Sequence, residues 1–455
     1  MTSSNNTALD KQTKDGVKFG KELREKEFMF QEGYVNLNHG SFGAYPKTIR
    51  DKMRGFQDAC EARPDSFIRY EYPKLLDEAR ASIGKLLNAP LDTVVFVPNA
   101  TTGINLVLRN LTFQPGDYIL YFATIYGACE KTVSYITETT PAEAVKIAYT
   151  YPVEDDWLVE AFDSKVKDVE RAGGKVKIAI FDTVVSMPGV RVPFERLTAA
   201  CKDAGVLSCI DGAHGVGQVE LDLRALDADF FVSNCHKWLH VPRGCAIFYV
   251  PLRNQHLMRS TLPTSHGFMP LRSTIVSPFP KSSKTPFTQA FEFTGTVDNA
   301  PYLCVPAALA WREGLGGEDV IRMYCQTLAR EGAALVAEEL RTEVLENETG
   351  SLGGGCCLAN VRLPIAVDVA EQHAAGAGID GCDVGAAVRD WMSKIAIDDY
   401  CTFIQSMFYG DAWWARLSGQ VYLDMEDMKW AARTLGAICK RVEAGEWTGT
   451  GKRSE

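Results

Sequence analysis

Side chains that could do chemistry directly follow several predicted strands. Asp182 and Ser186 come after the apolar run KIAIF, and Asp211 follows the run VLSCI. Lys237 comes after the run FFVS, within the sequence SNCHKW. Because ligands of a parallel sheet bind outside the carboxyl ends of its strands, we expect these groups to face one common site.

This set of groups suits the chemistry of pyridoxal phosphate. A lysine amine, here Lys237, can bind the cofactor aldehyde and later act as a base. A carboxylate such as Asp211 can keep the pyridine nitrogen protonated, so that the ring accepts electrons. The N-terminus of a helix can bind the phosphate, and a helix opens at Thr101 and Thr102 after the run TVVFVPNA.

Each of these signals also has an ordinary structural explanation. A lysine in an apolar run usually extends to solvent, and an aspartate at a strand end usually caps a turn or a helix. A Thr-Thr-Gly sequence before a helix is usually a helix cap. The occurrence of all of them in this order, on one sheet edge, favours a common chemical role.

The elements that must position these residues read as an α/β fold. Residues 47–87 show helical spacing of apolar side chains. Short apolar runs then alternate with helices, which is typical of a mostly parallel sheet covered by helices on both faces. The expected strands are 93–97, 117–122, 177–183, 206–210, 228–233 and 245–250, with helices over 99–111 and 193–204.

From residue 302 onward the pattern predicts a second, smaller α+β domain. The expected helices are 305–313, 320–340, 384–395 and 426–443, and the expected strands are 358–363 and 417–423. We therefore expect four parts: an N-terminal segment (1–46), partly disordered and packed on the small domain near the site, a large cofactor-binding domain (47–301), a small domain (302–447) and a frayed tail (448–455).

Length and composition limit the classes of protein that fit. A chain of 455 residues is too long for one hydrophobic core. Its net charge of −10 disfavours nucleic-acid and membrane partners. No secretory signal and no apolar stretch of roughly 18–20 residues is visible, so we expect a soluble cytoplasmic protein. The 13 cysteines lack zinc spacing, which favours reduced thiols and no metal site.

The order of the motifs resembles the class-V aminotransferase family of fold-type-I pyridoxal-phosphate enzymes. The matching runs are NATTGIN (99–105), DTVVS (182–186), DGAHG (211–215) and HKW (236–238). NHGSFG (38–43) and FTGT (293–296) are similar to the isopenicillin N epimerase-like branch of this family. The resemblance extends over roughly residues 34–423 and implies the fold-type-I architecture.

The resemblance implies a role for each matching residue. Lys237 would be the Schiff-base lysine and Asp211 the partner of the pyridine nitrogen. Tyr126 would stack on the ring where many relatives have a histidine, although a tyrosine packed under the sheet edge is the alternative. His214 would lie near the phenolic oxygen, with Asp182 and Ser186 close by. The residues expected around the phosphate are Ala100, Thr101, Thr102, His236, either Ser233 or Asn234, and Thr296 from the other subunit of a homodimer.

Four further residues are candidates for binding an amino-acid substrate. Arg416, in the run WARLS, matches the small-domain arginine that binds the substrate α-carboxylate, a task suited to a planar fork of donors. Asn38 and His39 are expected to line the entrance, and Arg69 is a candidate for contacting the substrate side chain.

The fold does not choose the reaction, so several remain open. A cysteine desulfurase needs a nucleophilic cysteine on a mobile loop, whereas Cys356 and Cys357 lead straight into a predicted strand. An epimerase needs a second proton donor that the sequence does not identify, and an aminotransferase is a further alternative. A cofactor-free scaffold would not need both Lys237 and Asp211. We favour a carbon–sulfur β-lyase for a cysteine S-conjugate or its sulfoxide, with Lys237 removing the α-proton and Tyr126 protonating the leaving sulfur.

Overall fold

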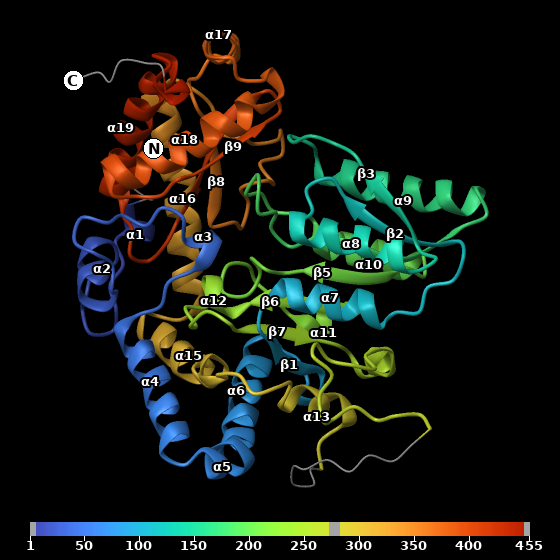
Figure 1. Cartoon of the computed structure of the whole chain (residues 1–455). Coiled ribbons are helices and arrows are strands. Elements are labelled where there is room, and N and C mark those ends of the chain that lie inside the picture. Colours follow the sequence, from blue (N-terminus) through green and yellow to red (C-terminus); the bar gives the residue numbers. More distant parts are fainter. Residues whose placement is uncertain (1–5, 273–282, 450–455) are drawn as a thin grey trace.

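The computed structural model describes residues 6–272 and 283–449 and is built around a seven-stranded sheet (Figure 1). The strand order is β1-β7-β6-β5-β4-β2-β3. Strands β2 to β6 run parallel, whereas β7 is antiparallel to both β6 and β1. The prediction of a mostly parallel sheet is therefore confirmed. The strands are β1 Val94–Val97, β2 Asp117–Phe122, β3 Glu143–Ile147, β4 Lys175–Asp182, β5 Leu207–Asp211, β6 Phe230–Asn234 and β7 Ala246–Tyr249.

Helices cover both faces of this sheet, because alternate residues of each central strand enter two separate hydrophobic cores. Ile178 and Ile180 of β4 belong to the core under α7 and α8, whereas Ala179 and Phe181 belong to the core under α9 and α10. Such burial on both faces explains why the strands are continuous apolar runs. The helices of this part are α4 Lys47–Ala62, α5 Pro64–Ser66, the π-helix η1 Phe67–Glu71, α6 Tyr72–Leu86, η2 Leu91–Thr93, α7 Ala100–Asn110, α8 Gly127–Thr139, α9 Asp155–Arg171, α10 Phe194–Asp203, α11 Leu223–Leu226, α12 Cys235–Trp238, η3 Leu252–Leu257, α13 Pro286–Glu292, α14 Ala300–Leu303 and α15 Val305–Gly314.

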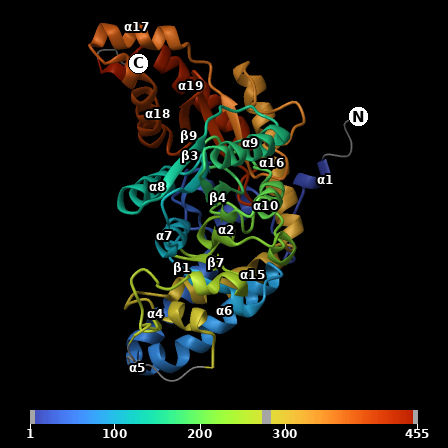
Figure 2. The same ribbon diagram turned by 90° about the vertical axis from the view of Figure 1, so that its right-hand side faces the viewer.

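A second, three-stranded antiparallel sheet of order β8-β10-β9 forms the smaller part of the fold, drawn in orange and red in Figures 1 and 2. None of the described helices, here or elsewhere, is long and apolar enough to cross a membrane. The elements are α16 Glu318–Leu340, β8 Leu358–Arg362, α17 Val367–Ala377, η4 Gly381–Asp383, α18 Val384–Tyr400, β9 Gln405–Tyr409, β10 Ala412–Ser418, α19 Met425–Glu443 and η5 Glu446–Thr448.

The sequence pattern misplaced one strand and missed two others. The strand expected over 417–423 is wrong, because the paired residues are those of β10, Ala412–Ser418. At Gly419 the chain instead passes so close to α16 that an added Cβ would lie 2.0 Å from the Cys325 carbonyl oxygen. The edge strands β3 and β9 escaped notice because exposed side chains interrupt their apolar pattern.

The N-terminal segment lies along the small domain, where the blue and red ends of the chain meet in Figure 1. Its Gly20 N–H donates to the Val421 carbonyl at 2.8 Å, and Arg24 forms an ion pair of 2.7 Å with Asp427. This segment then turns inward to reach the centre of the molecule. Its helices are α1 Asn6–Leu9, α2 Lys21–Glu27 and α3 His39–Phe42.

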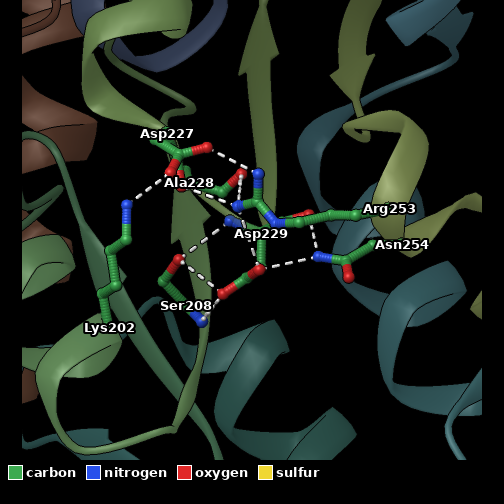
Figure 3. A network of polar contacts seen from close by, with 7 residues as sticks. All are labelled: Lys202, Ser208, Asp227, Ala228, Asp229, Arg253 and Asn254. Atoms are coloured by element: carbon green, nitrogen blue, oxygen red, sulfur yellow. Dashed lines mark hydrogen bonds and ion pairs between the residues drawn. The ribbon is translucent and has the colours of Figure 1, made fainter.

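An ion-pair network holds the amino ends of β5 and β6 together (Figure 3). Asp229, just before β6, accepts a hydrogen bond from the Ser208 N–H of β5 at 3.0 Å. Arg253 contacts both Asp227, at 2.5 Å, and Asp229, at 3.2 Å. Lys202 joins the network through Asp227 at 2.7 Å. These charges lie at the opposite end of the strands from Asp211 and thus fix the strands without entering the site.

A second charged contact, deep in the protein, supports the loops at the carboxyl ends of β5 and β6. Arg312 is 0% exposed and binds both carboxylate oxygens of Glu318, at 2.5 and 2.6 Å. The same guanidinium donates to the carbonyl of Trp238 at 2.8 Å and to that of Gly217 at 3.3 Å. It therefore ties the segment after β5 to the helix that carries Lys237.

We expect Arg312→Met to lower the free energy of unfolding by about 3–5 kcal/mol, because it leaves Glu318 and two carbonyl groups without their buried donor. The measurement is urea unfolding followed by fluorescence. Arg322→Met is the matched control, because Arg322 pairs with Asp319, whose side chain is 91% exposed, and should cost less than about 1 kcal/mol. Equal losses in the two variants would contradict this role for Arg312.

Candidate active site

The carboxyl ends of β4, β5 and β6 bring a lysine and two carboxylates together. Asp182 and Asp211 are register partners on adjacent strands, and Lys237 lies in α12, which directly follows β6. Burial raises the pKa of both carboxyl groups, and for Asp182 the nearby Asp211 raises it further. Burial and the neighbouring Arg416 lower the pKa of Lys237 to about 8, although the two carboxylates oppose this change.

The contacts of the Lys237 amine favour its uncharged form, which can react as a nucleophile. Its Nζ lies 2.9 Å from Nε2 of His214, whose Nδ1 lies 3.2 Å from the indole nitrogen of Trp238. An indole N–H can only donate, so Nδ1 is the acceptor and Nε2 of a neutral His214 carries the proton. Burial keeps the pKa of His214 well below its usual value, so the ring is neutral. Nε2–H is then directed at Nζ of Lys237, a geometry that favours the uncharged amine, as does the lowered pKa of Lys237.

Asp211 is oriented by two donors from different elements. Its Oδ1 accepts the Ala213 N–H at 2.9 Å, and its Oδ2 lies 3.4 Å from the Cys129 sulfur of α8. Cys129 was not among the expected site residues, because one cysteine in an amphipathic helix carries no motif. An opposite charge favours the ionised form of a buried carboxyl group, so Asp211 suits a protonated ring nitrogen.

The N-terminus of α7 is the expected anion site, but the residues that are open to an anion differ from those expected. Asn99 caps the helix by accepting the Thr102 N–H at 2.8 Å, so the expected role of that N–H at a phosphate is not supported. The Ala100 N–H donates to Asn234 Oδ1 at 2.9 Å. Among the described contacts, neither the N–H nor the hydroxyl of Thr101 forms a hydrogen bond. Thr101 is therefore the residue of this helix start that remains open to a phosphate.

Two neighbouring residues, Ser233 and Asn234, were both candidates for the phosphate, and the structure separates them. Ser233 is 0% exposed, donates its hydroxyl proton to the Gly212 carbonyl, and accepts the Val216 N–H at 2.8 Å. It supports the loop after β5 and does not face α7. Asn234 is the one that contacts the start of α7. His236 uses Nδ1 to donate to the Cys245 carbonyl at 2.9 Å, which leaves its Nε2 for another partner.

Arg416 is a buried cation without an anionic partner. Its Nη1 donates to the Ser186 carbonyl at 2.5 Å, and its Nη2 donates to Asn38 and Ser41 at 2.8 and 3.0 Å. Its Nε is buried and has no hydrogen-bond partner in the described chain. Burial lowers the pKa of Arg416 to about 10. A buried charge with neutral partners only is costly, so this position suits an incoming carboxylate.

The N-terminal motif NHGSFG supplies Asn38 to the site but not His39. His39 is 0% exposed, and both ring nitrogens contact protein, so the expectation that it lines an entrance is wrong. The spacing of the glycines in this motif could have predicted close packing. At Gly43, where φ is +65°, an added Cβ would lie 1.8 Å from the His236 carbonyl oxygen. Only glycine lets the segment approach α12 this closely.

Tyr126 stands immediately before α8, and its side chain is 48% exposed. The alternative of a tyrosine packed under the sheet edge therefore does not hold. Because Cys129 in the first turn of the same helix contacts Asp211, the start of α8 lies beside that carboxylate. This position suits an aromatic ring that covers one face of a bound cofactor.

Thr296 and Arg69 are not brought to Lys237 within one chain. Thr296 lines an apolar hollow together with Phe67 and Ile68 of η1. Arg69, in the same short helix, binds Asp65 at 3.1 Å. Thr296 therefore lies against η1 and Arg69 lies within it, and neither is among the described contacts of Lys237.

The described groups fit pyridoxal phosphate. An uncharged amine at Lys237 suits its aldehyde, the buried Asp211 suits its ring nitrogen, and the open N–H and hydroxyl of Thr101 suit its phosphate. Tyr126, exposed at the start of the helix whose Cys129 contacts Asp211, is available for stacking. The residues present therefore fit this cofactor.

Comparison with known proteins agrees with this donor set. The family model Aminotransferase class-V matches residues 46–319. The chain is 39% identical to the L-cysteine desulfhydrase-like protein lolT1 of Epichloe uncinata, covering 94% of this chain and 97% of that protein. It is 26% identical to hercynylcysteine sulfoxide lyase of Schizosaccharomyces pombe, covering 92% and 98%.

The fold also agrees with a solved structure. The cystine C–S lyase C-DES, in complex with its product cysteine persulfide, matches with a TM-score of 0.68 at 17% identity. The match covers 89% of this chain and 97% of that one. The chain belongs to the class-V aminotransferase family and is a pyridoxal-phosphate enzyme.

Proposed function

We propose that the chain is a carbon–sulfur β-lyase that cleaves cysteine S-conjugates. The reaction would release the sulfur fragment, pyruvate and ammonia, with water consumed in the last step. The observation that carries the proposal is the buried Lys237 amine, which has a lowered pKa and lies 2.9 Å from His214, together with the buried Arg416, which lacks an anionic partner. This pair can bind an α-amino acid by its carboxylate and remove its α-proton.

The cofactor and the chain would divide the work. Pyridoxal phosphate, when bound, withdraws electrons from the substrate α-carbon, so that a proton there becomes acidic and a β-substituent can leave. Lys237, Asp211, Thr101 and Tyr126 would hold it. Asp211 favours this chemistry because its negative charge keeps a proton on the ring nitrogen.

Two proton transfers would fall to residues of this chain. Lys237 would take the α-proton, which requires the free amine that the low pKa and the His214 contact favour. Tyr126 would give a proton to the departing sulfur, because it is exposed at the start of α8, the helix whose Cys129 contacts Asp211. Arg416 would bind the α-carboxylate through its unpartnered Nε.

The buried cysteines argue against a cysteine desulfurase. Cys356 and Cys357 are each 1% exposed and lie directly before β8. Burial raises the pKa of Cys356 to about 12, so its thiol is not a ready nucleophile. Gln218 accepts the Cys357 N–H at 2.8 Å, which anchors this segment to the large domain.

We propose hercynylcysteine sulfoxide as the substrate, with a sulfenate as the leaving fragment. The relative called hercynylcysteine sulfoxide lyase aligns over nearly its whole length. A sulfoxide sulfur is also a good leaving group on the β-carbon. Free L-cysteine is the second candidate, favoured by the name of the relative that is 39% identical. Among other reactions, epimerisation and transamination of an amino acid remain the alternatives if no carbon–sulfur bond is cleaved.

The deciding measurement is pyruvate release by the cofactor-loaded protein from hercynylcysteine sulfoxide, L-cysteine and other cysteine sulfoxides. We expect pyruvate from the hercynyl substrate to be fastest, and Lys237→Ala to lower its rate at least about 10³-fold because the base is lost. Fastest release from L-cysteine would change the substrate and keep the lyase. No pyruvate from any of them, with the visible cofactor absorbance intact, would rule out the lyase.

Tyr126→Phe should retain the cofactor but lower the elimination rate by about 10²-fold, because stacking survives while the proton donor is lost. Cofactor content is read from absorbance and the rate from pyruvate release. Tyr135→Phe is the matched control, since Tyr135 is on the same helix and is 44% exposed. Turnover equal to that of the unchanged enzyme would remove Tyr126 from the acid role.

We also propose a homodimer in which Thr296 reaches the phosphate of the neighbouring subunit. The hollow that Thr296 lines is apolar, and Val297 and Tyr70 beside it are 62% and 57% exposed, as expected of a protein interface. Light scattering should give twice the chain mass. Val297→Asp should weaken both the dimer and cofactor affinity, unlike Met323→Asp at another exposed apolar position. A cofactor-loaded monomer would contradict the shared site.

A further inference from the structure

A continuous chain of hydrogen bonds links the small domain to the backbone of Lys237. The Asn36 amide donates to the Tyr422 hydroxyl oxygen at 2.8 Å. The same hydroxyl lies 2.8 Å from Nδ1 of His39, and Nε2 of His39 lies 2.7 Å from the Lys237 carbonyl oxygen. The lysine that does the chemistry is thus held by its own peptide group as well as by His214.

The direction of each bond in this chain follows from the groups involved. The Lys237 carbonyl can only accept, so Nε2 of His39 carries the ring proton. Nδ1 of a neutral ring must then accept from the Tyr422 hydroxyl, and the hydroxyl oxygen is free to accept from Asn36. Every donor has one acceptor, and only one tautomer of His39 satisfies the whole chain.

The surroundings keep His39 in that single state. His39 and Tyr422 are both 0% exposed. Burial, together with the nearby guanidinium groups of Arg312 and Arg243, lowers the pKa of His39 to about 3, whereas its bond to the Lys237 carbonyl acts in the opposite direction. The ring is therefore neutral near pH 7.

Packing alone does not require a histidine at this position. The His39 ring lies among aromatic rings, 5.1 Å from that of Trp238 and 5.7 Å from that of Tyr422. A phenyl ring would fill this space without burying polar nitrogen atoms. The histidine contributes two directed bonds, one to each domain.

The two hydrogen bonds of His39 connect the domain that supplies Lys237 with the domain that supplies Arg416. Lys237 comes from the large domain, whereas Arg416 comes from β10 of the small domain, shortly before Tyr422. An amino acid whose carboxylate binds Arg416 places its α-carbon near Lys237 only if these two residues keep a fixed separation. Asn38, the residue before His39, also binds Arg416, so one segment contacts both.

We propose that His39 is a positioning residue for Lys237, and that the chain Asn36–Tyr422–His39 sets the separation between the lysine and Arg416. This inference rests on the proposed role of Lys237 as the base. A small displacement of the reacting groups lowers the reaction rate much more than it weakens substrate binding.

The first test compares steady-state kinetics of His39→Phe, Tyr422→Phe and the control Tyr324→Phe. Tyr324 also has a buried hydroxyl in the small domain, which donates to the Leu423 carbonyl at 2.6 Å and does not touch His39. We expect kcat to fall at least about 10-fold in His39→Phe and about threefold in Tyr422→Phe, with KM within about threefold of the original. Tyr324→Phe should keep kcat and lose only thermal stability.

The second test needs no activity. Hydrogen exchange of the full chain, without added cofactor, is followed in peptides spanning residues 234–241. Exchange there should be at least about 10-fold faster in His39→Phe and unchanged in Tyr324→Phe, because only the first variant releases the Lys237 carbonyl. His39→Gln, whose amide can accept from Tyr422 and donate to Lys237, should restore part of the protection and of kcat.

Two outcomes would overturn the proposal: unchanged exchange over residues 234–241 in His39→Phe, or the same kcat loss in Tyr324→Phe as in His39→Phe. If His39→Phe does not fold, Tyr422→Phe and His39→Gln are compared with Tyr324→Phe in its place. The failure of the proposed function looks different, because no pyruvate would then be released from any of the cysteine substrates, while the exchange result for His39 stood.

Discussion

The removal of charged groups from water at one edge of the large sheet is the constraint on which the site depends. Asp182, Asp211 and Arg416 are each at most 6% exposed, and none of them has an opposite charge within salt-bridge distance among the described residues. A charge on Lys237 would favour the ionised carboxylates, but burial and Arg416 lower the pKa of this lysine. A cation beside Asp211 and an anion beside Arg416 would stabilise these two buried groups. A protonated cofactor ring and a substrate carboxylate supply these two charges, which explains why the site is built for ligands and not for internal ion pairs.

Residues outside the chemistry keep these groups in place. Arg312 binds the segments after β5 and β6, and Ser233 of β6 binds the segment after β5. Gln218 donates to the His214 carbonyl and accepts from Cys357, so the loop after β5 is also fixed to the small domain. A side chain that must meet a partner to within tenths of an ångström needs such support, because its own rotamers would otherwise scatter. The catalytic edge is therefore rigid because its loops are bound to buried groups on several sides.

The N-terminal segment is part of this support, although it lies far from the other site residues in sequence. Asn38 contacts Arg416, His39 contacts Lys237, and Arg243 donates to the Gly43 carbonyl at 3.0 Å. Gly43 allows the segment to lie directly against α12, where any side chain would collide with the backbone. The two domains thus meet at the lysine through a third piece of chain, and the distance between the carboxylate-binding and proton-transferring groups depends on it.

The sequence by itself determined the parallel sheet, the order of its strands along the chain, and the position of Lys237 and Asp211 at strand ends. These features follow from local periodicity and from the rule that parallel strands expose their ligands at one edge. Periodicity could not reveal the edge strands β3 and β9, whose exposed residues interrupt the pattern, nor the shift of the last strand to Ala412–Ser418. Only the tertiary structure decided that Cys129 contacts Asp211, that Ser233 serves a loop, and that His39 is buried behind Lys237. The physical reason is that hydrogen-bond partners in a folded core are chosen by distance and direction between segments remote in sequence, and neither quantity is present in the order of residues.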